Sequence, residues 1–267
     1  MQSIRLVFID LDGTLLSSSH EILGTSENAI RQLISKNIHV VVTTGRSFSG
    51  MQEAVKSLPF SLPSPVSVHN GALILDKQKV ARKLLLKKDS IVDLVSKARQ
   101  LKLHIGFQTD FETYLEEAMG RFEWIYKLHG IDPVIVEDLL ELEIDLVKVS
   151  FYGDEDDVSS LLAHFDEGGK SEEVSLFRSG LYFADATAKQ ATKLHAAKWI
   201  SKTLNLTSEN VLAIGDQAND VEMLKWAEVG VAMGNAEDHV KKIANFVTRS
   251  NDDDGIYFAL KSHGLLP

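Results

Sequence analysis

The sequence predicts an α/β protein in which a parallel sheet, flanked by helices, is interrupted by an inserted α+β module. Near both ends of the chain, short apolar runs alternate with segments of helical periodicity, which is typical of parallel β-α-β units. In the middle, paired short strands separated by turns indicate an antiparallel module. We therefore place the core at residues 1–82 and 187–267, and the inserted module at residues 83–186.

The core elements follow in β-α order. A strand rich in Ile, Val, Leu and Phe ends at Asp10, and a helix over 25–36 leads to a second buried strand at 39–44. The same order returns after the module. The remaining core elements that we expect are a helix at 50–58, a strand at 65–70, helices at 193–204 and 221–227, and strands at 210–216, 229–233 and 245–248.

The inserted module has shorter elements. Its strands are paired by turns such as the one expected at 178–180, where Ser and Gly follow Arg. The expected helices are 88–102, 119–129 and 154–165, and the expected strands are 104–108, 111–115, 132–136, 144–152, 173–178 and 181–186.

Composition limits the classes of partner and location. The 267 residues are 44% hydrophobic and 25% charged, as in ordinary globular proteins. The absence of cysteine excludes disulfides and thiolate chemistry, and with no signal peptide or long apolar run it favours a cytoplasmic location. A net charge of −10 argues against nucleic acid and membranes as partners. A small phosphorylated ligand stays possible because near charges outweigh screened distant ones. Monomer and dimer both remain open.

The first strand ends in two carboxylates, Asp10 and Asp12, followed by Gly13. Neighbouring carboxylates repel, so either one pKa rises or a cation joins them, and both outcomes are useful in catalysis. A calcium loop of the EF-hand type is excluded, because a strand rather than a helix precedes the pair and alternating oxygen ligands are missing. A plain Asp-Gly turn is the remaining alternative.

Polar residues also follow the other expected parallel strands. Thr44, Asn70 and Asp216 stand at strand ends, where open α/β sheets bind ligands. Asp220 lies four residues after Asp216 and either caps a helix or joins a metal site. With Asp10 and Asp12 expected opposite, oxygen ligands alone favour Mg²⁺ as a cofactor.

Several motifs together resemble one family. They are DLDGT at 10–14, TTGR at 43–46, Lys193, GDQAND at 215–220, AMGNA at 232–236 and SNDDDG at 250–255. In order and spacing they resemble the haloacid dehalogenase superfamily, and more narrowly the Cof-type phosphatases of subfamily IIB. The resemblance implies a Rossmann-like core and assigns the inserted module as a C2B cap.

The resemblance implies a role for each carboxylate. Asp10 would be the nucleophile, and Asp12 the general acid and base. Mg²⁺ would be bound by Asp10, the backbone carbonyl of Asp12 and Asp216, with Asp220 acting directly or through water.

The resemblance also implies a phosphate site. Thr44 and the Gly45 amide would bind phosphate oxygens, Lys193 would neutralise charge, and Asn219 would orient the cluster. Lys189 lies near the same motif, but the family's spacing selects Lys193 and leaves Lys189 as a surface charge. Gln190, where glycine is usual, departs from the family pattern.

Three further residues, Arg46, His69 and Asn70, are candidates for the substrate rim because of their places at the sheet edge. The acidic residues 252–254 are expected to form a solvated turn near this rim. The function expected is Mg²⁺-dependent hydrolysis of small phosphorylated metabolites through an aspartyl-phosphate. Sugar phosphates come first as substrates, and pyridoxal phosphate and FMN follow. A sugar phosphomutase and a non-catalytic phosphometabolite-binding protein are the alternatives.

Overall fold

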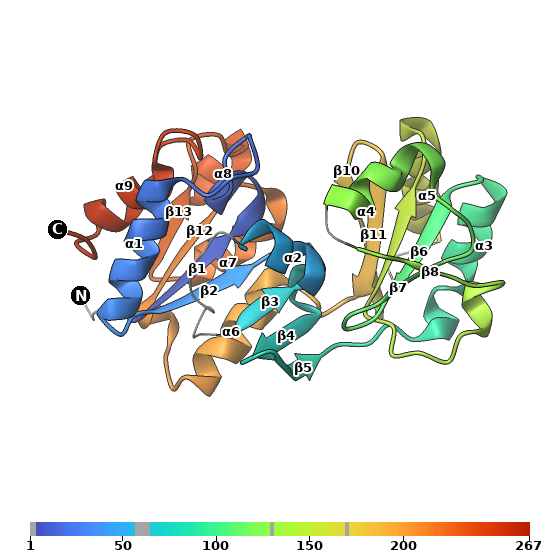
Figure 1. Cartoon of the computed structure of the whole chain (residues 1–267), viewed down its shortest axis with the longest axis horizontal. Coiled ribbons are helices and arrows are strands. Elements are labelled where there is room, and N and C mark those ends of the chain that lie inside the picture. Colours follow the sequence, from blue (N-terminus) through green and yellow to red (C-terminus); the bar gives the residue numbers. More distant parts are fainter. Residues whose placement is uncertain (1–3, 57–64, 129–130, 169–170) are drawn as a thin grey trace. The chain divides into compact units, whose positions relative to one another are not determined.

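The structure is a computed structural model that describes residues 4–56, 65–128, 131–168 and 171–267. By its contacts the chain divides into two compact units. The core unit contains Met1–Gly45, Ala54–Ala81 and Thr192–Pro267, and the inserted unit contains Arg46–Glu53 and Arg82–Ala191. Both contain a β-sheet and helices (Figure 1).

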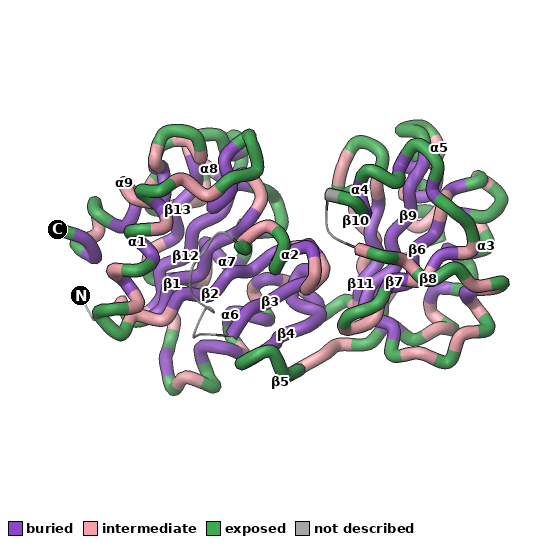
Figure 2. Tube along the Cα trace, in the orientation of Figure 1, coloured by how far each residue is buried: buried purple, intermediate pink, exposed green. Residues whose placement is uncertain are grey.

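An eight-stranded sheet forms the centre of the core unit, in the order β14-β13-β12-β1-β2-β3-β4-β5. The strands from β14 to β3 are parallel, and β4 is antiparallel to β3. The central strands are buried along their whole length, as expected of a parallel sheet between helices (Figure 2). The bounds are β1 Leu6–Asp10, β2 His39–Thr43, β3 Val66–Val68, β4 Leu73–Asp76, β5 Lys79–Lys83, β12 Val211–Gly215, β13 Val229–Ala232 and β14 Phe246–Val247.

The strands β4 and β5 were not expected from the sequence. Their connection, Lys77-Gln78, has positive φ at both residues, +50° and +64°. Hairpin turns of this type normally contain Asn or Gly, so the sequence lacks the usual signal.

The expected helices of this region are present as α1 Gly24–Ser35, α2 Phe48–Ala54, α6 Lys193–Thr203 and α7 Val221–Trp226. Two short helices, α8 Asp238–Ile243 and α9 Gly255–Ser262, were not expected. Helix α9 packs on α1, and α6 packs on α7. The last residues of the helix expected at 50–58 lie outside the described residues.

The inserted unit has a six-stranded sheet in the order β10-β11-β9-β6-β7-β8, antiparallel except between β7 and β8. The helices α3 and α5 cover one face of this sheet with an apolar core that includes Val149 and Phe151. The bounds are β6 His104–Gln108, β7 Thr113–Leu115, β8 Val134–Ile135, β9 Lys148–Tyr152, β10 Val174–Gly180, β11 Phe183–Ala188, α3 Val92–Gln100, α4 Glu123–Leu128 and α5 Glu155–Glu167.

Two expectations for the inserted unit were wrong in detail. The strand expected at 144–152 begins only at Lys148. The turn expected at 178–180 is instead the irregular end of β10, whose pairing with β11 shifts between Arg178 and Gly180. Residue 129, the end of the helix expected at 119–129, lies outside the described residues.

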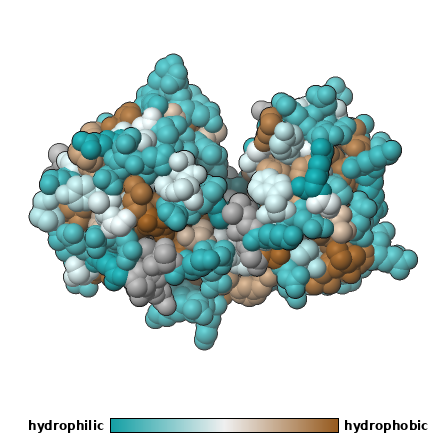
Figure 3. All heavy atoms as spheres, turned by 45° about the horizontal axis from the view of Figure 1, so that its top comes forward, coloured by the Kyte–Doolittle hydropathy of each residue, from teal (hydrophilic) through white to brown (hydrophobic). Residues whose placement is uncertain are grey.

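The face of the molecule in Figure 3 is largely hydrophilic, with small separate hydrophobic patches. Among the described residues, no helix is both long enough and apolar enough to span a membrane.

Candidate active site

The first part of the site is the tight turn Leu11–Leu15 that follows β1. It is closed by a bond from the Leu16 N–H to the Leu11 carbonyl, and Gly13 has φ +76°. A Cβ atom at position 13 would lie 2.4 Å from Asp216 Oδ2, so glycine is needed both for the backbone and for the space. Asp10 at the strand end is buried, and Asp12 in the turn is half-buried.

The second part follows β12. Asp216 is buried at the strand end, and its Oδ1 accepts a hydrogen bond of 2.7 Å from the Thr14 hydroxyl. Thr14 had no expected role, although it belongs to the DLDGT motif. Gly215 is again required sterically, because a Cβ there would lie 2.3 Å from Asp220 Cγ.

Asp220 makes the capping contacts that one of the two sequence-based alternatives predicts, and it also contacts Lys193. Its Oδ2 accepts hydrogen bonds of 3.2 Å from the backbone N–H groups of Asp216 and Gln217, which is a helix-capping arrangement. Its Oδ1 accepts a bond of 2.8 Å from Lys193 Nζ. One carboxylate therefore anchors the loop and also faces the candidate site.

Lys193 is the first residue of α6. Thr192 caps this helix by accepting a bond from the His195 N–H, which directs the chain so that Lys193 is buried. Lys193 Nζ lies 2.6 Å from Asp10 Oδ1 and thus bridges Asp10 and Asp220. Lys189, by contrast, is exposed.

The charges of this cluster change its pKa values. Burial raises the pKa of Asp10 well above its usual range; Lys193 opposes this shift, and the carboxylates of Asp220 and Asp216 add to it. Burial alone would lower the pKa of Lys193, but the attraction of Asp10 and Asp220 raises it. Both shifts show that the acidic side chains and the ammonium interact strongly within one buried site.

The donor set fits a hard divalent cation. One carboxylate oxygen from each of Asp10, Asp216 and Asp220 lies within 4.8 Å of the others, and all three residues are buried. Three carboxylates and one ammonium leave a negative excess that a cation would offset, and oxygen donors suit Mg²⁺. Asp12 does not contribute its carboxylate to this group.

Three of the expected phosphate-binding residues, Thr44, Gly45 and Asn219, meet the rim candidate Asn70 next to β2. Thr44 is buried, with its N–H bonded to the Ser67 carbonyl and its own carbonyl to the Asn70 N–H. Asn70 Oδ1 accepts a bond of 3.0 Å from Asn219 Nδ2. Gly45 lies against the Asn70 side chain, where a Cβ would approach Nδ2 to 3.2 Å. Four residues from three segments therefore meet at this edge.

Backbone strain is concentrated beside this group. His69, Asn70 and Gly71 have successive φ values of +51°, +55° and +94°. Such conformations are costly for residues other than glycine and are concentrated at functional sites. A Cβ at Gly71 would lie 2.4 Å from the Thr192 carbonyl, so this turn packs directly on the start of α6. His69 is fully buried, which places it below the surface rather than on a rim.

Arg46 differs from the other rim candidates in the unit to which it belongs. It is buried, its Nη1 donates to the Gly50 carbonyl at 3.4 Å, and by its contacts it belongs to the inserted unit.

Two late motifs hold the Leu11–Leu15 turn in place. Asn235 Nδ2 donates to the Gly13 carbonyl at 2.8 Å, and Asn235 Oδ1 accepts from the Asn251 N–H at 3.0 Å. Asn251 Nδ2 in turn donates to the Leu16 carbonyl at 2.9 Å. Asp252 was expected only as part of a solvated turn, yet it accepts a bond from the Ser18 N–H. The sequence revealed these motifs but gave no sign of which residues they contact.

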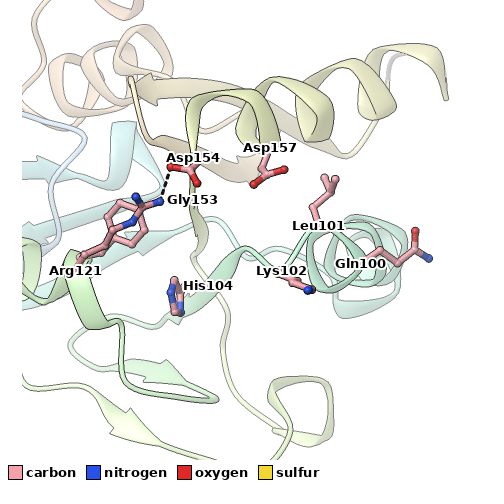
Figure 4. A pocket seen from close by; sticks show the side chains of 9 residues that line it. Gln100, Leu101, Lys102, His104, Arg121, Gly153, Asp154 and Asp157 are labelled. Carbon is pink, nitrogen blue, oxygen red and sulfur yellow. Dashed lines mark hydrogen bonds and ion pairs between the residues drawn. The ribbon is translucent and has the colours of Figure 1, made fainter.

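The inserted unit also has a surface pocket of about 440 Å³ (Figure 4). Arg121 and Asp154 form an ion pair across it, and His104 and Asp157 also point toward it. The described residues that line it include none of the expected catalytic residues.

The family of the protein follows from a comparison with known families. A family model described as haloacid dehalogenase-like hydrolase matches residues 7–260, and the chain belongs to this family. The resemblance noted in the motifs is thereby confirmed, as is the expectation that the protein is a hydrolytic enzyme.

Individual relatives cover the whole length. The chain is 28% identical to the putative phosphatase YxeH of Bacillus subtilis, over 96% of this chain and 97% of that protein. It is 31% identical to the 5-amino-6-(5-phospho-D-ribitylamino)uracil phosphatase YcsE of the same organism, over 97% and 95%. A haloacid dehalogenase-like hydrolase from Bacteroides thetaiotaomicron has a similar solved structure, with TM-score 0.87, 26% identity and coverage of 97% and 99%.

Proposed function

We propose that the protein is a Mg²⁺-dependent phosphatase that hydrolyses small phosphorylated metabolites through a phosphorylated Asp10. The observation that supports this most directly is the buried group of Asp10, Asp216 and Asp220 with Lys193 between two of its carboxylates. A carboxylate nucleophile for phosphate needs such neutralisation, because two like charges about 4 Å apart repel by roughly 4 kcal/mol even at an effective dielectric near 20.

The proposed reaction has two chemical steps. In the first, an Asp10 oxygen bonds to phosphorus while the bond from phosphorus to the alcohol oxygen breaks, and Asp12 gives that oxygen a proton. In the second, Asp12 takes a proton from a water molecule whose oxygen bonds to phosphorus. The bond from phosphorus to Asp10 then breaks, which releases phosphate and restores both residues.

The other residues would bind Mg²⁺ and the phosphate group. Asp10, Asp216 and Asp220 would hold Mg²⁺, together with the Asp12 carbonyl, and the ion when bound neutralises charge on the phosphate. Thr44 and the Gly45 amide would bind phosphate oxygens. Lys193 would favour the ionised form of Asp10 through its direct hydrogen bond, against the effect of burial. Asn219 and Asn70 would fix the edge of the phosphate site.

We also propose that the inserted module, 83–186 in the sequence-based division, acts as a cap that selects the alcohol being released. The likeness to a ribitylaminouracil phosphate phosphatase supports sugar-like and sugar-alcohol phosphates as first candidates. Pyridoxal phosphate and FMN are further candidates.

Phosphate release from a substrate panel tests the proposal. The panel contains sugar phosphates, 5-amino-6-(5-phospho-D-ribitylamino)uracil, pyridoxal phosphate, FMN and p-nitrophenyl phosphate, each with Mg²⁺ and with a chelator. We expect turnover only with Mg²⁺, and loss of turnover in Asp10→Asn. Asp238→Asn is the matched control because Asp238 is an exposed aspartate of the same unit. Turnover by Asp10→Asn at the wild-type rate would exclude Asp10 as the nucleophile. Isomerised product without free phosphate would indicate a mutase.

A further inference from the structure

A short hairpin of the core unit follows the Leu11–Leu15 turn. Leu16 and Ile22 form an isolated bridge at its base. Above the bridge, the Ser17 N–H donates to the Glu21 carbonyl at 2.9 Å, and the residues between these two are exposed. A two-stranded hairpin of this length has little stability of its own in water. Its position must therefore depend on contacts with other parts of the unit.

Two such contacts come from residues 250–255, which we call the acidic loop. Asn251 Nδ2 donates to the Leu16 carbonyl at 2.9 Å, at the base of the hairpin. Asp252 Oδ1 accepts a bond of 2.8 Å from the Ser18 N–H, near the tip of the hairpin. Partners in these bonds are 234 and 235 positions apart in the sequence, so the loop fixes the hairpin through tertiary contacts alone.

A third contact lies just beyond the hairpin, and the acidic loop is itself well held. Asp254 Oδ1 accepts a bond from the Thr25 hydroxyl at the start of α1. Within the loop, the N–H groups of Asp253 and Gly255 both donate to the Ser250 carbonyl, at 3.1 Å and 3.0 Å. The loop therefore has the internal bonds that it needs to act as a fixed support.

Leu16 connects this support to Asp12. Its N–H donates to the Leu11 carbonyl at 2.9 Å and closes the turn that carries Asp12, while its carbonyl accepts the bond from Asn251. The Asn251 N–H also donates to the side chain of Asn235, which bonds to the same turn from its other side. Both ends of the turn are thus tied to the acidic loop.

Positioning explains these contacts better than stability does. Asp252 and Ser18 are exposed, and a hydrogen bond between exposed groups adds little stability because water offers each group a similar partner. Three consecutive carboxylates, at residues 252–254, also repel one another. Rate is far more sensitive than stability to small restraints, since a displacement of about 1 Å near a reacting group can cost about 10²-fold in rate.

We propose that the acidic loop positions Asp12 for proton transfer, and that Asn251 and Asp252 are the residues through which it acts. Neither is a catalytic residue; each restrains the backbone on the C-terminal side of Asp12. This inference rests on the phosphatase function proposed above, in which Asp12 is the general acid and base.

A double-mutant cycle between Asp252→Ala and Asp12→Ala tests the inference, with p-nitrophenyl phosphate as substrate. Asp12 takes a proton from water in the second step whichever alcohol has left, so this substrate reports on its position. Asp252→Ala alone should lower kcat about fivefold to tenfold, with KM and the Kd for Mg²⁺ within about twofold of wild type. In the Asp12→Ala background the same change should alter kcat by less than about twofold, because the group that it positions is already gone.

Two control variants make the cycle decisive. Asp252→Asn keeps an oxygen acceptor for the Ser18 N–H and should recover most of the rate. Asp253→Ala removes an exposed carboxylate that bonds only to Ser250 inside the loop, so kcat should stay within about twofold of wild type. Thermal unfolding verifies that each variant is folded.

Three results would overturn the inference: wild-type kcat in Asp252→Ala, the full loss of rate persisting in the Asp12→Ala background, or an equal loss in Asp253→Ala. A failure of the proposed function looks different. In that case the wild-type protein itself would release no phosphate, with Mg²⁺ present, from p-nitrophenyl phosphate or from the rest of the substrate panel.

Discussion

Lys193 Nζ lies 2.6 Å from Asp10 Oδ1, although the two residues are 183 positions apart in the sequence. The same Nζ donates to Asp220 Oδ1, so one cation joins the strand-end carboxylate of β1 to the loop after β12. Because all three side chains are buried, this contact determines both the charge of the candidate site and the cost of disturbing it.

Lys193→Met should therefore affect activity and stability together. Removal of a preorganised positive group should lower the rate of phosphate release by a factor of about 10²–10³. Without metal, loss of the buried pair should lower the free energy of unfolding by about 3 kcal/mol, and Mg²⁺ should restore part of it. Phosphate release and thermal unfolding with and without Mg²⁺ measure both effects. Lys189→Met, an exposed lysine four residues earlier, is the control. Equal loss in both variants would contradict a specific role for Lys193.

Gly13→Ala should disrupt the Leu11–Leu15 turn. Its new Cβ would lie 2.4 Å from Asp216 Oδ2, and φ is +76°, which alanine adopts only with strain. We expect a loss of about 1–3 kcal/mol in unfolding free energy and loss of Mg²⁺ affinity. Calorimetric Mg²⁺ titration and urea unfolding test this. Gly24→Ala is the control because no atom lies within 4 Å of its added Cβ, and wild-type behaviour of Gly13→Ala would refute the steric argument.

Asn235→Ala should slow turnover although Asn235 does not belong to the proposed reacting group. The change removes the bond to the Gly13 carbonyl and leaves the Asn251 N–H without its acceptor. We expect kcat to fall about tenfold with a smaller change in KM, because the turn that positions Asp12 loosens. Steady-state kinetics measure this, and Asn235→Asp, which retains an acceptor for Asn251, should recover part of the rate. Asn28→Ala, at an exposed position of α1, should have no effect.

Asp12→Ala should separate proton transfer from metal binding. The carboxylate of Asp12 does not belong to the metal-fitting group, so Mg²⁺ affinity should stay within about twofold of wild type. Turnover should fall by a factor of about 10²–10⁴, which is the usual contribution of a positioned acid or base. Asp216→Asn, by contrast, should lose Mg²⁺ affinity. If Asp12→Ala also lost it, the Asp12 carboxylate would be a metal ligand and its proton-transfer role would need revision.

Much of the fold could be predicted from local patterns. Apolar runs and helical periodicity predicted most strands and helices because each depends on neighbouring residues. The hairpin of β4 and β5 could not be predicted in this way, since its turn consists of Lys77 and Gln78, without the glycine or asparagine that usually marks such a turn. Helices α8 and α9 are short and lack strong sequence signals.

The sequence by itself determined the candidate carboxylates of the core, because strand-end aspartates and glycine turns are local features. Only the tertiary structure decided that Thr14 holds Asp216, that Asn235 holds Gly13, and that Ser150 bonds to Asp185. Those contacts depend on sheet order and strand register, which bring distant segments together. Register is a property of packed strands, and one residue of shift would turn Lys148 and Ser150 to the opposite face of the inserted sheet.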